Sequence, residues 1–169
     1  MSLSIRLRRL VFRCAYLVLW AYRVIVRPEV SGVKCVLTDG GHVLLVRHTY
    51  GPREWDLPGG GIKRGEGPAT AARREMREEL GVDIPNLRDA GEVLAALNRS
   101  RATVYCFAAE LRDPEITIER GEIGAARWFA ADDLPPRIGR LTLPVLRRAG
   151  ALTPRGGPGA PPAAPSRRA

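Results

Sequence analysis

The sequence predicts an α/β domain in which a mixed β-sheet is covered by helices, and two observations lead to this prediction. Short runs rich in β-branched residues lie on both sides of one long helical segment, and a further helical segment closes the domain. The chain has 169 residues, of which 45% are hydrophobic. That is enough for one domain with a buried core, and it leaves some excess at the ends.

The basic residues gather at the two ends of the chain. The formal net charge is +9, but the first 27 residues hold six arginines and no acidic residue, and the chain from Pro136 onward holds seven arginines and no acidic residue. The middle keeps 14 basic residues against all 18 acidic ones, so its net charge is close to −4. A nucleic-acid-binding core would instead carry Lys and Arg on the folded domain. We therefore expect no specific nucleic-acid partner, although basic ends can attract a nucleic acid or an anionic membrane.

The chain divides into three parts. Residues 1–30 are predicted to form a basic and apolar N-terminal helix, residues 31–150 the domain, and residues 151–169 a disordered tail rich in Pro, Gly and Ala. The three cysteines, Cys14, Cys35 and Cys106, show no metal-ligand spacing. Cys35 and Cys106 lie in apolar runs, where we expect buried free thiols.

The domain is predicted to begin with a β-hairpin and a glycine loop. Residues 33–37 and 42–46 are β-rich runs on either side of Asp39-Gly40-Gly41, a turn that favours a hairpin. Residues 57–61 read Leu-Pro-Gly-Gly-Gly, and we expect them to form a flexible loop.

A strong helix is predicted from Gly67 to Leu80. Pro68 suits its first turn, Gly81 lies just past its end, and the interior is rich in Ala, Arg, Glu and Leu. After this helix we expect strands at residues 91–97, 102–109, 116–118 and 125–129, and a last helix at residues 143–148.

One face of the central helix is acidic. At 100° per residue, Glu75, Glu78 and Glu79 fall within an arc of about 100°. An apolar stripe lies beside them, formed by Ala69, Ala72, Met76 and Leu80. A solvated acidic face is the simplest interpretation of such a pattern. However, clustered carboxylates also suit hard cations such as Mg²⁺ or Mn²⁺, and a triple-glycine loop directly before the helix lets the backbone approach a metal or a phosphate closely.

These residues also match a known signature. Gly60 is followed after five residues by Glu66, and after seven more by residues 74–82, which read Arg-Glu-Met-Arg-Glu-Glu-Leu-Gly-Val. Every fixed position of the Nudix signature is present in this box, residues 60–82, and the flanks at residues 55–61, 127–129 and 132–135 look like the family too. The sequence therefore resembles the Nudix hydrolases (MutT-like) over residues 31–150, without an assignable subfamily. The resemblance implies a Nudix-like α/β/α sandwich with a mixed sheet.

The resemblance also implies the chemistry. Nudix hydrolases cleave a diphosphate linkage in nucleoside diphosphates joined to another moiety, X, by water attack on phosphorus, and they use Mg²⁺ or Mn²⁺. Carried over to this sequence, the catalytic residues are Glu75, Glu78 and Arg74, and the choice of general base stays open. The expected metal ligands are Glu75, Glu78, Glu79, the carbonyl of Gly59, and Glu122 from outside the box. Gly60, Glu66 and Gly81 would have structural roles within the motif.

The substrate is less well defined by the sequence. Trp55, Arg47 and Gly60 are the expected substrate-binding residues, and Trp55 or Tyr50 could stack on a base, with core packing as the alternative for Trp55. No subfamily signature is matched, including that of the NADH-cleaving branch, whereas the small size and the spacing of Glu122 favour nucleoside triphosphates. Two alternatives remain: a nucleotide-binding regulatory module that does not hydrolyse, which the intact box argues against, and an RNA-end processing hydrolase.

The N-terminal segment has a second periodic pattern. On a helix, seven basic and aromatic residues share an arc of about 100°: Arg6, Arg9, Arg13, Tyr16, Trp20, Arg23 and Arg27. The longest uncharged run has nine residues, whereas a transmembrane helix needs about 20. The helix is expected either to lie in a membrane interface or to pack on its own domain or on a second copy of the chain. We therefore predict a cytoplasmic protein with a small nucleotide-like substrate, and with peripheral membrane contact or a homodimer through this helix.

Overall fold

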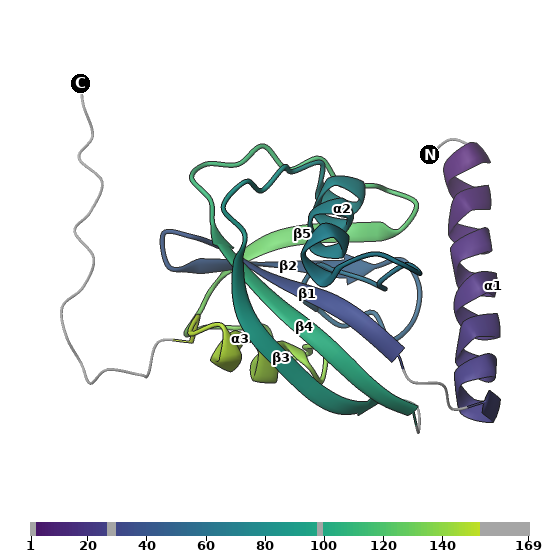
Figure 1. Cartoon of the computed structure of the whole chain (residues 1–169). Helices are drawn as coiled ribbons and strands as arrows, with labels where there is room; N and C mark the ends of the chain where they lie inside the picture. Colours follow the sequence, from purple (N-terminus) through teal and green to yellow (C-terminus); the bar gives the residue numbers. More distant parts are fainter. Residues whose placement is uncertain (1–2, 27–29, 98–99, 153–169) are drawn as a thin grey trace.

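The computed structural model of the protein describes residues 3–26, 30–97 and 100–152. Three helices and five strands make up this part of the chain (Figure 1). In chain order they are α1 (Leu3–Val26), β1 (Val30–Asp39), β2 (His42–His48), α2 (Pro68–Leu80), β3 (Arg88–Leu97), β4 (Ser100–Glu110), β5 (Ile123–Ala130) and α3 (Thr142–Arg148).

The five strands form one mixed sheet in the order β3-β4-β1-β2-β5. β1 and β4 run parallel, and the other neighbouring pairs are antiparallel. The predicted hairpin is confirmed: Asp39 of β1 pairs with His42 of β2, and the two glycines between them have φ values of 52° and 82°. A two-residue turn with both central φ angles positive suits the twist of a hairpin, and glycine adopts it at little cost.

The helices α2 and α3 cover opposite faces of the sheet, which confirms the α/β/α sandwich (Figure 1). The strand alternation explains both core layers, because successive side chains point to opposite faces. Val33, Cys35 and Leu37 of β1 pack in the layer of α2, together with Met76 and Leu80. The intervening Val36 packs in the layer of α3 with Val145 and Leu146.

α2 begins and ends where the sequence predicts. Pro68 occupies its first turn, and Gly81 ends it with a left-handed φ of 67°, its N–H donating to the carbonyl of Arg77. The buried arc of α2 is turned further toward the glutamates than the sequence pattern predicts. Ala71 and Glu79 are buried for that reason, while Ala69, which the predicted stripe included, is exposed.

One expectation about a connecting segment is wrong. Residues 116–118 form no strand, because their own backbone donates to the end of α2 instead: the N–H of Thr117 bonds to the carbonyl of Leu80 at 2.9 Å. The glycine loop lies along β1. The N–H groups of Val33 and Cys35 donate to the carbonyls of Gly60 and Pro58, each at 2.9 Å.

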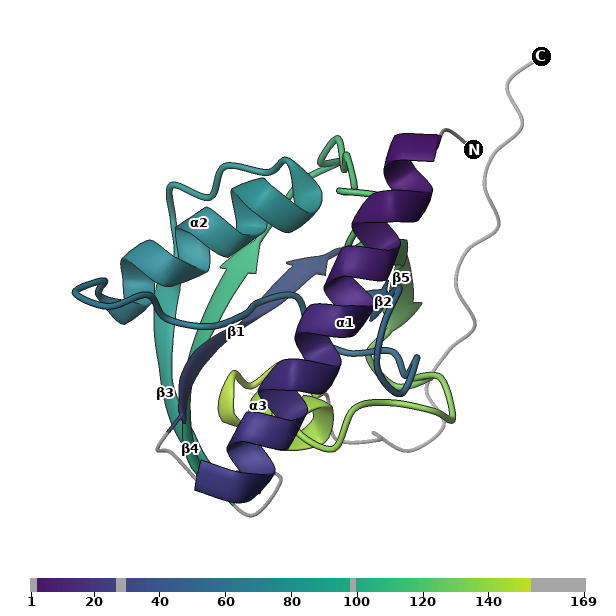
Figure 2. The same cartoon turned by 90° about the vertical axis from the view of Figure 1, so that its right-hand side faces the viewer.

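The predicted N-terminal helix is present as α1, which stands at one end of the sandwich and crosses its layers (Figures 1 and 2). Within residues 3–26, 30–97 and 100–152, no helix is long and apolar enough to cross a membrane. Cys35 and Cys106 are buried free thiols, as predicted, and Cys14 on α1 is exposed. The tail expected to be disordered falls, from residue 153 on, outside the described residues.

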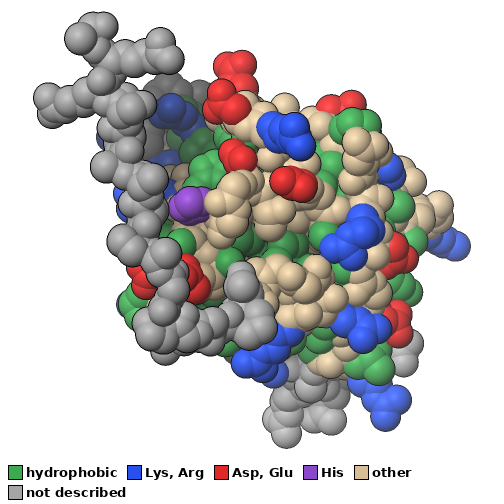
Figure 3. Space-filling model, turned by 90° about the vertical axis from the view of Figure 1, so that its left-hand side faces the viewer, with side chains coloured by type: hydrophobic (Ala, Val, Ile, Leu, Met, Phe, Trp, Pro, Cys, Tyr) green, Lys and Arg blue, Asp and Glu red, His purple; other side chains and the backbone are tan. Residues whose placement is uncertain are grey.

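Charge is distributed evenly at the end of the sandwich away from α1. The face shown in Figure 3 has acidic and basic side chains interspersed with apolar ones. That mixture contrasts with α1, whose charged residues are all arginines.

Candidate active site

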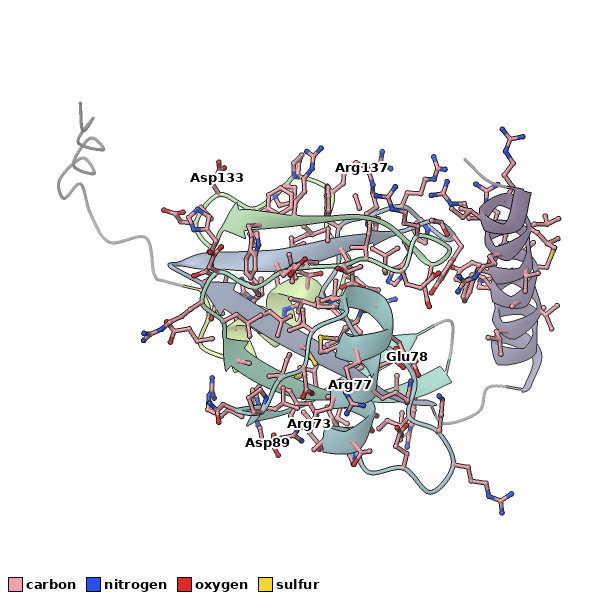
Figure 4. All side chains as sticks on the ribbon, turned by 90° about the horizontal axis from the view of Figure 1, so that it is seen from above. Arg73, Arg77, Glu78, Asp89, Asp133 and Arg137 are labelled. Carbon is pink, nitrogen blue, oxygen red and sulfur yellow. The ribbon has the colours of Figure 1, made fainter. Side chains whose placement is uncertain are left out.

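A cavity of about 580 Å³ lies between α1, the glycine loop and the acidic face of α2. Glu75, Glu78 and Glu122 line one side, together with the loop residues 59–61. Figure 4 shows Glu78 on the side of α2 that is nearer to α1. A second cavity of about 550 Å³ opens on the α3 side beside β3 and β4, but its lining includes a single acidic residue, Glu110. The cavity beside α2 is therefore the one with a cluster of carboxylates.

Arg74 organises three of the acidic side chains. Its Nε and Nη2 donate to the two carboxylate oxygens of Glu66 at 2.8 and 2.9 Å. Its Nη1 donates to Glu75 at 2.7 Å and to Glu78 at 3.0 Å. The guanidinium also reaches the carbonyl of Gly61 at 2.9 Å. The hydrogen bonds from Arg74 lower the pKa of Glu66 to about 2, so Glu66 anchors the guanidinium as a carboxylate.

Glu79 is the buried member of the acidic face. Its side chain belongs to a residue only 2% exposed, and its Oε2 accepts a hydrogen bond from the N–H of Gly59 at 2.9 Å. Burial raises its pKa to about 8, although the charge of Lys34 and the bond from Gly59 act in the opposite direction. Without a cation nearby, this carboxyl tends to keep a proton at neutral pH. A bound cation would favour the ionised form.

The glycine loop is fitted closely against these acids. A Cβ on Gly60 would lie 2.6 Å from a carboxylate oxygen of Glu75. Gly59 has a φ of 134°, and a Cβ there would collide with the backbone of β1 at Val33. Gly59 requires glycine for this reason, whereas a side chain at Gly60 would displace the carboxylate of Glu75. The loop backbone can therefore line the same space as the carboxylates.

The structure also brings Glu122 to the acidic cluster from a distant part of the chain. Ligand atoms of His48, Glu79 and Glu122 all lie within 4.8 Å of one another. The hydroxyl of Tyr50 donates to Glu122 at 2.6 Å and fixes its orientation. Nδ1 of His48 is buried and has no hydrogen-bond partner, and burial lowers the pKa of this imidazole to about 4, so the ring is neutral.

This donor set fits a divalent cation. The cluster offers carboxylate oxygens, which Mg²⁺ and Mn²⁺ prefer, from Glu75, Glu78, Glu79 and Glu122. The pKa of Glu79 is raised, and Nδ1 of His48 has no hydrogen-bond partner. Both observations indicate that a positive charge or a hydrogen-bond partner would be favourable at this position.

Two of the expected substrate-binding residues lie elsewhere. Trp55 packs edge-on against Phe129, with 5.0 Å between ring centroids, in the core layer of α3. The guanidinium of Arg47 stacks over the same indole at 5.1 Å. Neither residue is among those that line the cavity, whereas Gly60 is. Core packing, the alternative weighed for Trp55, describes its position in the structure.

Sequence reasoning missed a partly buried ion pair beside the site. Nζ of Lys34 donates to Asp56 at 2.8 Å and to the carbonyl of Leu57 at 2.7 Å, and Asp56 also accepts from the hydroxyl of Thr142 at 2.9 Å. Burial acts to lower the pKa of Lys34 and to raise the pKa of Asp56. Each charge stabilises the other, however, and this effect is larger, so the pKa of Lys34 is raised and the pKa of Asp56 is lowered. A lysine within the apolar run of β1 was the available signal for this pair.

Comparison with known proteins identifies the family. A family model described as the NUDIX domain matches residues 28–148. The chain belongs to the NUDIX family. The NAD-capped RNA hydrolase NudC of Pseudomonas aeruginosa is 35% identical over 136 residues, which are 75% of this chain and 48% of that protein. The chain thus spans about half the length of that curated relative. The RNA pyrophosphohydrolase of Rhodospirillum rubrum is 46% identical over 141 residues, covering 72% of this chain and 84% of that protein.

Solved structures agree with the fold. The MutT NUDIX hydrolase of Burkholderia pseudomallei superposes with a TM-score of 0.66 at 27% identity, over 72% of this chain and 98% of that one. The NUDIX domain of Shewanella oneidensis NrtR, solved with ADP ribose, gives a TM-score of 0.65 at 21% identity, over 73% and 87% of the two chains. The resemblance seen in the sequence is confirmed at the level of family and fold.

Proposed function

We propose that this protein is a Nudix phosphoanhydride hydrolase, which cleaves a diphosphate linkage in a nucleoside diphosphate-X substrate by water attack on phosphorus and needs Mg²⁺ or Mn²⁺. One observation carries the proposal: Glu75, Glu78 and the glycine loop line one cavity, where Arg74 holds the two glutamates and the buried Glu79 accepts from the N–H of Gly59. The relatives named as hydrolases support it.

The acidic residues have two proposed roles, as ligands of the cation and as the general base. Glu75, Glu78, Glu79 and Glu122 are the proposed ligands of the cation, with the carbonyl of Gly59 as an additional ligand. When bound, the cation supplies charge neutralisation for the diphosphate and helps to activate the attacking water. Burial raises the pKa of Glu75, so this residue is suited to take up the proton of that water, although Glu78 remains the other candidate for general base.

Arg74 has a positioning role in this proposal. Its Nη1 lies between Glu75 and Glu78, and Glu66 holds the other edge of the guanidinium. The two carboxylates are thereby held at a fixed separation before any ligand arrives, which lowers the cost of organising the site.

Two substrate classes fit this site: small nucleotides, such as nucleoside triphosphates, and the 5′ end of RNA. The names of the relatives favour the second class, because one is an RNA pyrophosphohydrolase and another acts on NAD-capped RNA. The negative charge of the central domain favours the first.

A hydrolysis screen tests the function and separates the two classes. The substrates are nucleoside triphosphates, NAD, ADP-ribose, 5′-triphosphate RNA and NAD-capped RNA, each with Mg²⁺ and with EDTA. We expect turnover only with Mg²⁺, and at least a 100-fold loss in Glu78→Gln. Glu92→Gln removes a similar charge from an exposed position on β3 and should leave turnover unchanged.

Three results would count against the proposal. Full turnover in Glu78→Gln, or turnover in EDTA, would remove the metal-site assignment. The absence of turnover on every substrate would favour the alternative of a nucleotide-binding module that does not hydrolyse.

A further inference from the structure

The cavity has an aromatic wall opposite its acidic wall, and α1 supplies it. Phe12, Tyr16 and Trp20 are spaced by four residues, so they share an arc of about 80° on the helix. All three line the same cavity as Glu75 and Glu78. Figure 2 shows α1 lying across this end of the sandwich.

One ion pair and two ring contacts hold α1 in this position. Arg8 forms an ion pair with Glu119 at 2.7 Å, in the segment that leads to β5. The ring of Phe12 is stacked on Tyr50, with centroids 6.0 Å apart and planes at 15°, and the ring of Tyr16 lies 5.6 Å from Tyr50. Since the hydroxyl of Tyr50 donates to Glu122, a continuous set of contacts joins α1 to the acidic cluster.

We propose that the face of α1 formed by Phe12, Tyr16 and Trp20 binds the nucleobase of the substrate while the acidic wall binds its diphosphate. This inference rests on the proposed function and adds the residues that select the substrate. Aromatic rings are the usual platforms for bases, because every base has a flat face that can stack. The cavity volume of about 580 Å³ lies in the range that holds small-molecule ligands. Trp55, the residue that the sequence suggested for stacking, lies outside the cavity lining.

Two non-hydrolysable probes separate the two walls. Methylenediphosphonate carries only the diphosphate-like group, whereas α,β-methylene-ADP carries the same kind of group with adenosine attached. Calorimetric titration of the full chain in Mg²⁺ gives a dissociation constant for each, and their ratio reports what the adenosine contributes. We expect α,β-methylene-ADP to bind at least about tenfold more tightly.

Substitutions on α1 then test which side chains provide the affinity that adenosine adds. Tyr16→Ala and Trp20→Ala should each reduce the ratio by about fivefold to tenfold and leave the affinity for methylenediphosphonate unchanged. Tyr16→Phe keeps the ring and should restore most of the ratio. Leu94→Ala removes an exposed side chain on β3 that is not among the residues lining the cavity, and it should change neither constant.

The outcomes distinguish this inference from the proposed function. If adenosine adds no affinity, or if Tyr16→Ala weakens both probes equally, the aromatic wall has no role in recognition while the metal site stands. If methylenediphosphonate itself shows no Mg²⁺-dependent binding, the proposed function fails and this inference fails with it.

The opposite face of α1 carries an independent signal. Five aliphatic side chains on it are between 57% and 68% exposed: Leu7, Leu10, Val11, Leu17 and Val18. They share an arc of about 120° on the side of the helix away from the cavity. Arg6 and Arg13 are exposed beside them, and the first 27 residues include six arginines and no acidic residue.

We infer that this outer face docks on an anionic lipid surface with α1 lying in the plane of the membrane. Leucine and valine side chains enter the boundary of the acyl chains, and flanking arginines meet the negative headgroups. The exposed Arg6 and Arg13 lie beside the aliphatic side chains, and no acidic residue occurs in this segment, so the charge at the edge of this face is complementary to such a surface.

Vesicle sedimentation of the full chain tests the docking. The protein is expected to sediment with vesicles that contain phosphatidylglycerol, and not with pure phosphatidylcholine. Leu10→Gln with Val18→Gln should reduce the bound fraction at least about fivefold, because both side chains would lose their place in the lipid boundary. Leu94→Gln changes a side chain that is 74% exposed on β3, and it should bind as the unchanged protein does.

Two outcomes contradict the docking. Equal sedimentation with both kinds of vesicle, or with none, would remove the lipid surface as the partner. If Leu10→Gln with Val18→Gln instead abolished a dimer measured by light scattering while vesicle binding was unchanged, the face would belong to a second copy of the chain.

Discussion

The side chains on the two walls of the cavity differ in their partners and in their exposure. On the α2 wall, each glutamate of the acidic face has a partner within the domain, either Arg74 or the N–H of Gly59. On the α1 wall, aromatic rings face the cavity, and the aliphatic side chains on the outside are exposed. The α2 wall is organised before any ligand arrives. We propose that the partners of the α1 wall lie outside the domain: a nucleobase for its aromatic face and a lipid surface for its aliphatic face.

The largest difference should appear in stability, when buried and exposed ion pairs are compared. Asp56→Asn leaves the ammonium of Lys34, whose side chain is only 14% exposed, with the carbonyl of Leu57 as a partner, and should lower the free energy of unfolding by about 3 kcal/mol. Arg8→Gln breaks a pair on α1 whose arginine side chain is 58% exposed, and should cost less than about 1 kcal/mol. Urea denaturation measures both. Equal losses would contradict the difference in burial between the two ion pairs.

The same pair gives a pH dependence with a defined sign. The pKa of Asp56 is lowered by Lys34, so the folded protein binds this proton less readily than the unfolded chain does. The stability that Asp56 contributes is therefore present above its ordinary pKa near 3.8 and is lost as the pH falls below it. Urea titrations from pH 7 to pH 3 should show the gap between the unchanged protein and Asp56→Asn closing at the acid end. A gap that stays constant would contradict the assignment.

The next largest effect concerns catalysis on the α2 wall. Arg74→Gln releases Glu66, Glu75 and Glu78 from one guanidinium, and turnover should fall about 100-fold because the carboxylates lose their fixed separation. Arg74→Lys should not restore turnover, since an ammonium cannot make the paired bonds of the guanidinium. Steady-state kinetics with Mg²⁺ measures this, and Arg73→Gln is the matched control. Restoration by lysine would mean that charge alone is required.

Metal binding should stabilise the α2 wall without involving α1. At 100 times its dissociation constant, Mg²⁺ should add about 2.7 kcal/mol to the free energy of unfolding. Glu79→Gln should remove most of that gain, whereas Tyr16→Ala should keep it, because Tyr16 lies on the wall opposite the ligands. Thermal unfolding with and without Mg²⁺ gives the comparison. Loss of the gain in Tyr16→Ala would mean that α1 takes part in holding the cation.

The smallest expected effect is at the end of α2. Gly81 has a φ of 67°, so Gly81→Ala places a Cβ in the left-handed region and should cost about 1 kcal/mol. Gly150→Ala, at a φ of 70° with open space around the added Cβ, should cost less, because a Cβ on Gly81 would also lie 3.2 Å from Cβ of Thr117. Turnover should survive in both variants. A large loss in Gly81→Ala alone would show that the end of α2 controls the glutamates.

The sequence predicted most of what is set locally. The bounds of α2, the hairpin and the acidic face follow from helix caps, turn residues and side-chain periodicity. The segment 116–118 has a suitable composition for a strand. Its backbone N–H at Thr117 instead donates to the carbonyl of Leu80 at the end of α2, and no local sequence pattern reveals this contact. Most of the candidate site was instead predicted through the resemblance to the Nudix hydrolases, because its residues lie within one box.

The rest of the site depends on contacts between distant parts of the chain. Trp55 could be assigned either to the core or to a base, and only the position of Phe129 decides its packing. The stripe of arginines in the sequence predicted that α1 is amphipathic. It did not predict that Phe12 faces the cavity, which follows from the stacking of Phe12 on Tyr50. Residues that are close in space and far apart in sequence set these orientations.

The central claim is that water attacks phosphorus at the acidic cluster with a divalent cation in place. Hydrolysis in ¹⁸O-labelled water with Mg²⁺, followed by mass spectrometry of the products, tests it most directly on whichever substrate turns over. We predict one ¹⁸O atom in a phosphoryl group of a product, at least 100-fold slower formation of this labelled product by Glu78→Gln, and none in EDTA. Label in the X moiety instead of phosphate, or equal labelling by Glu78→Gln, would contradict the account.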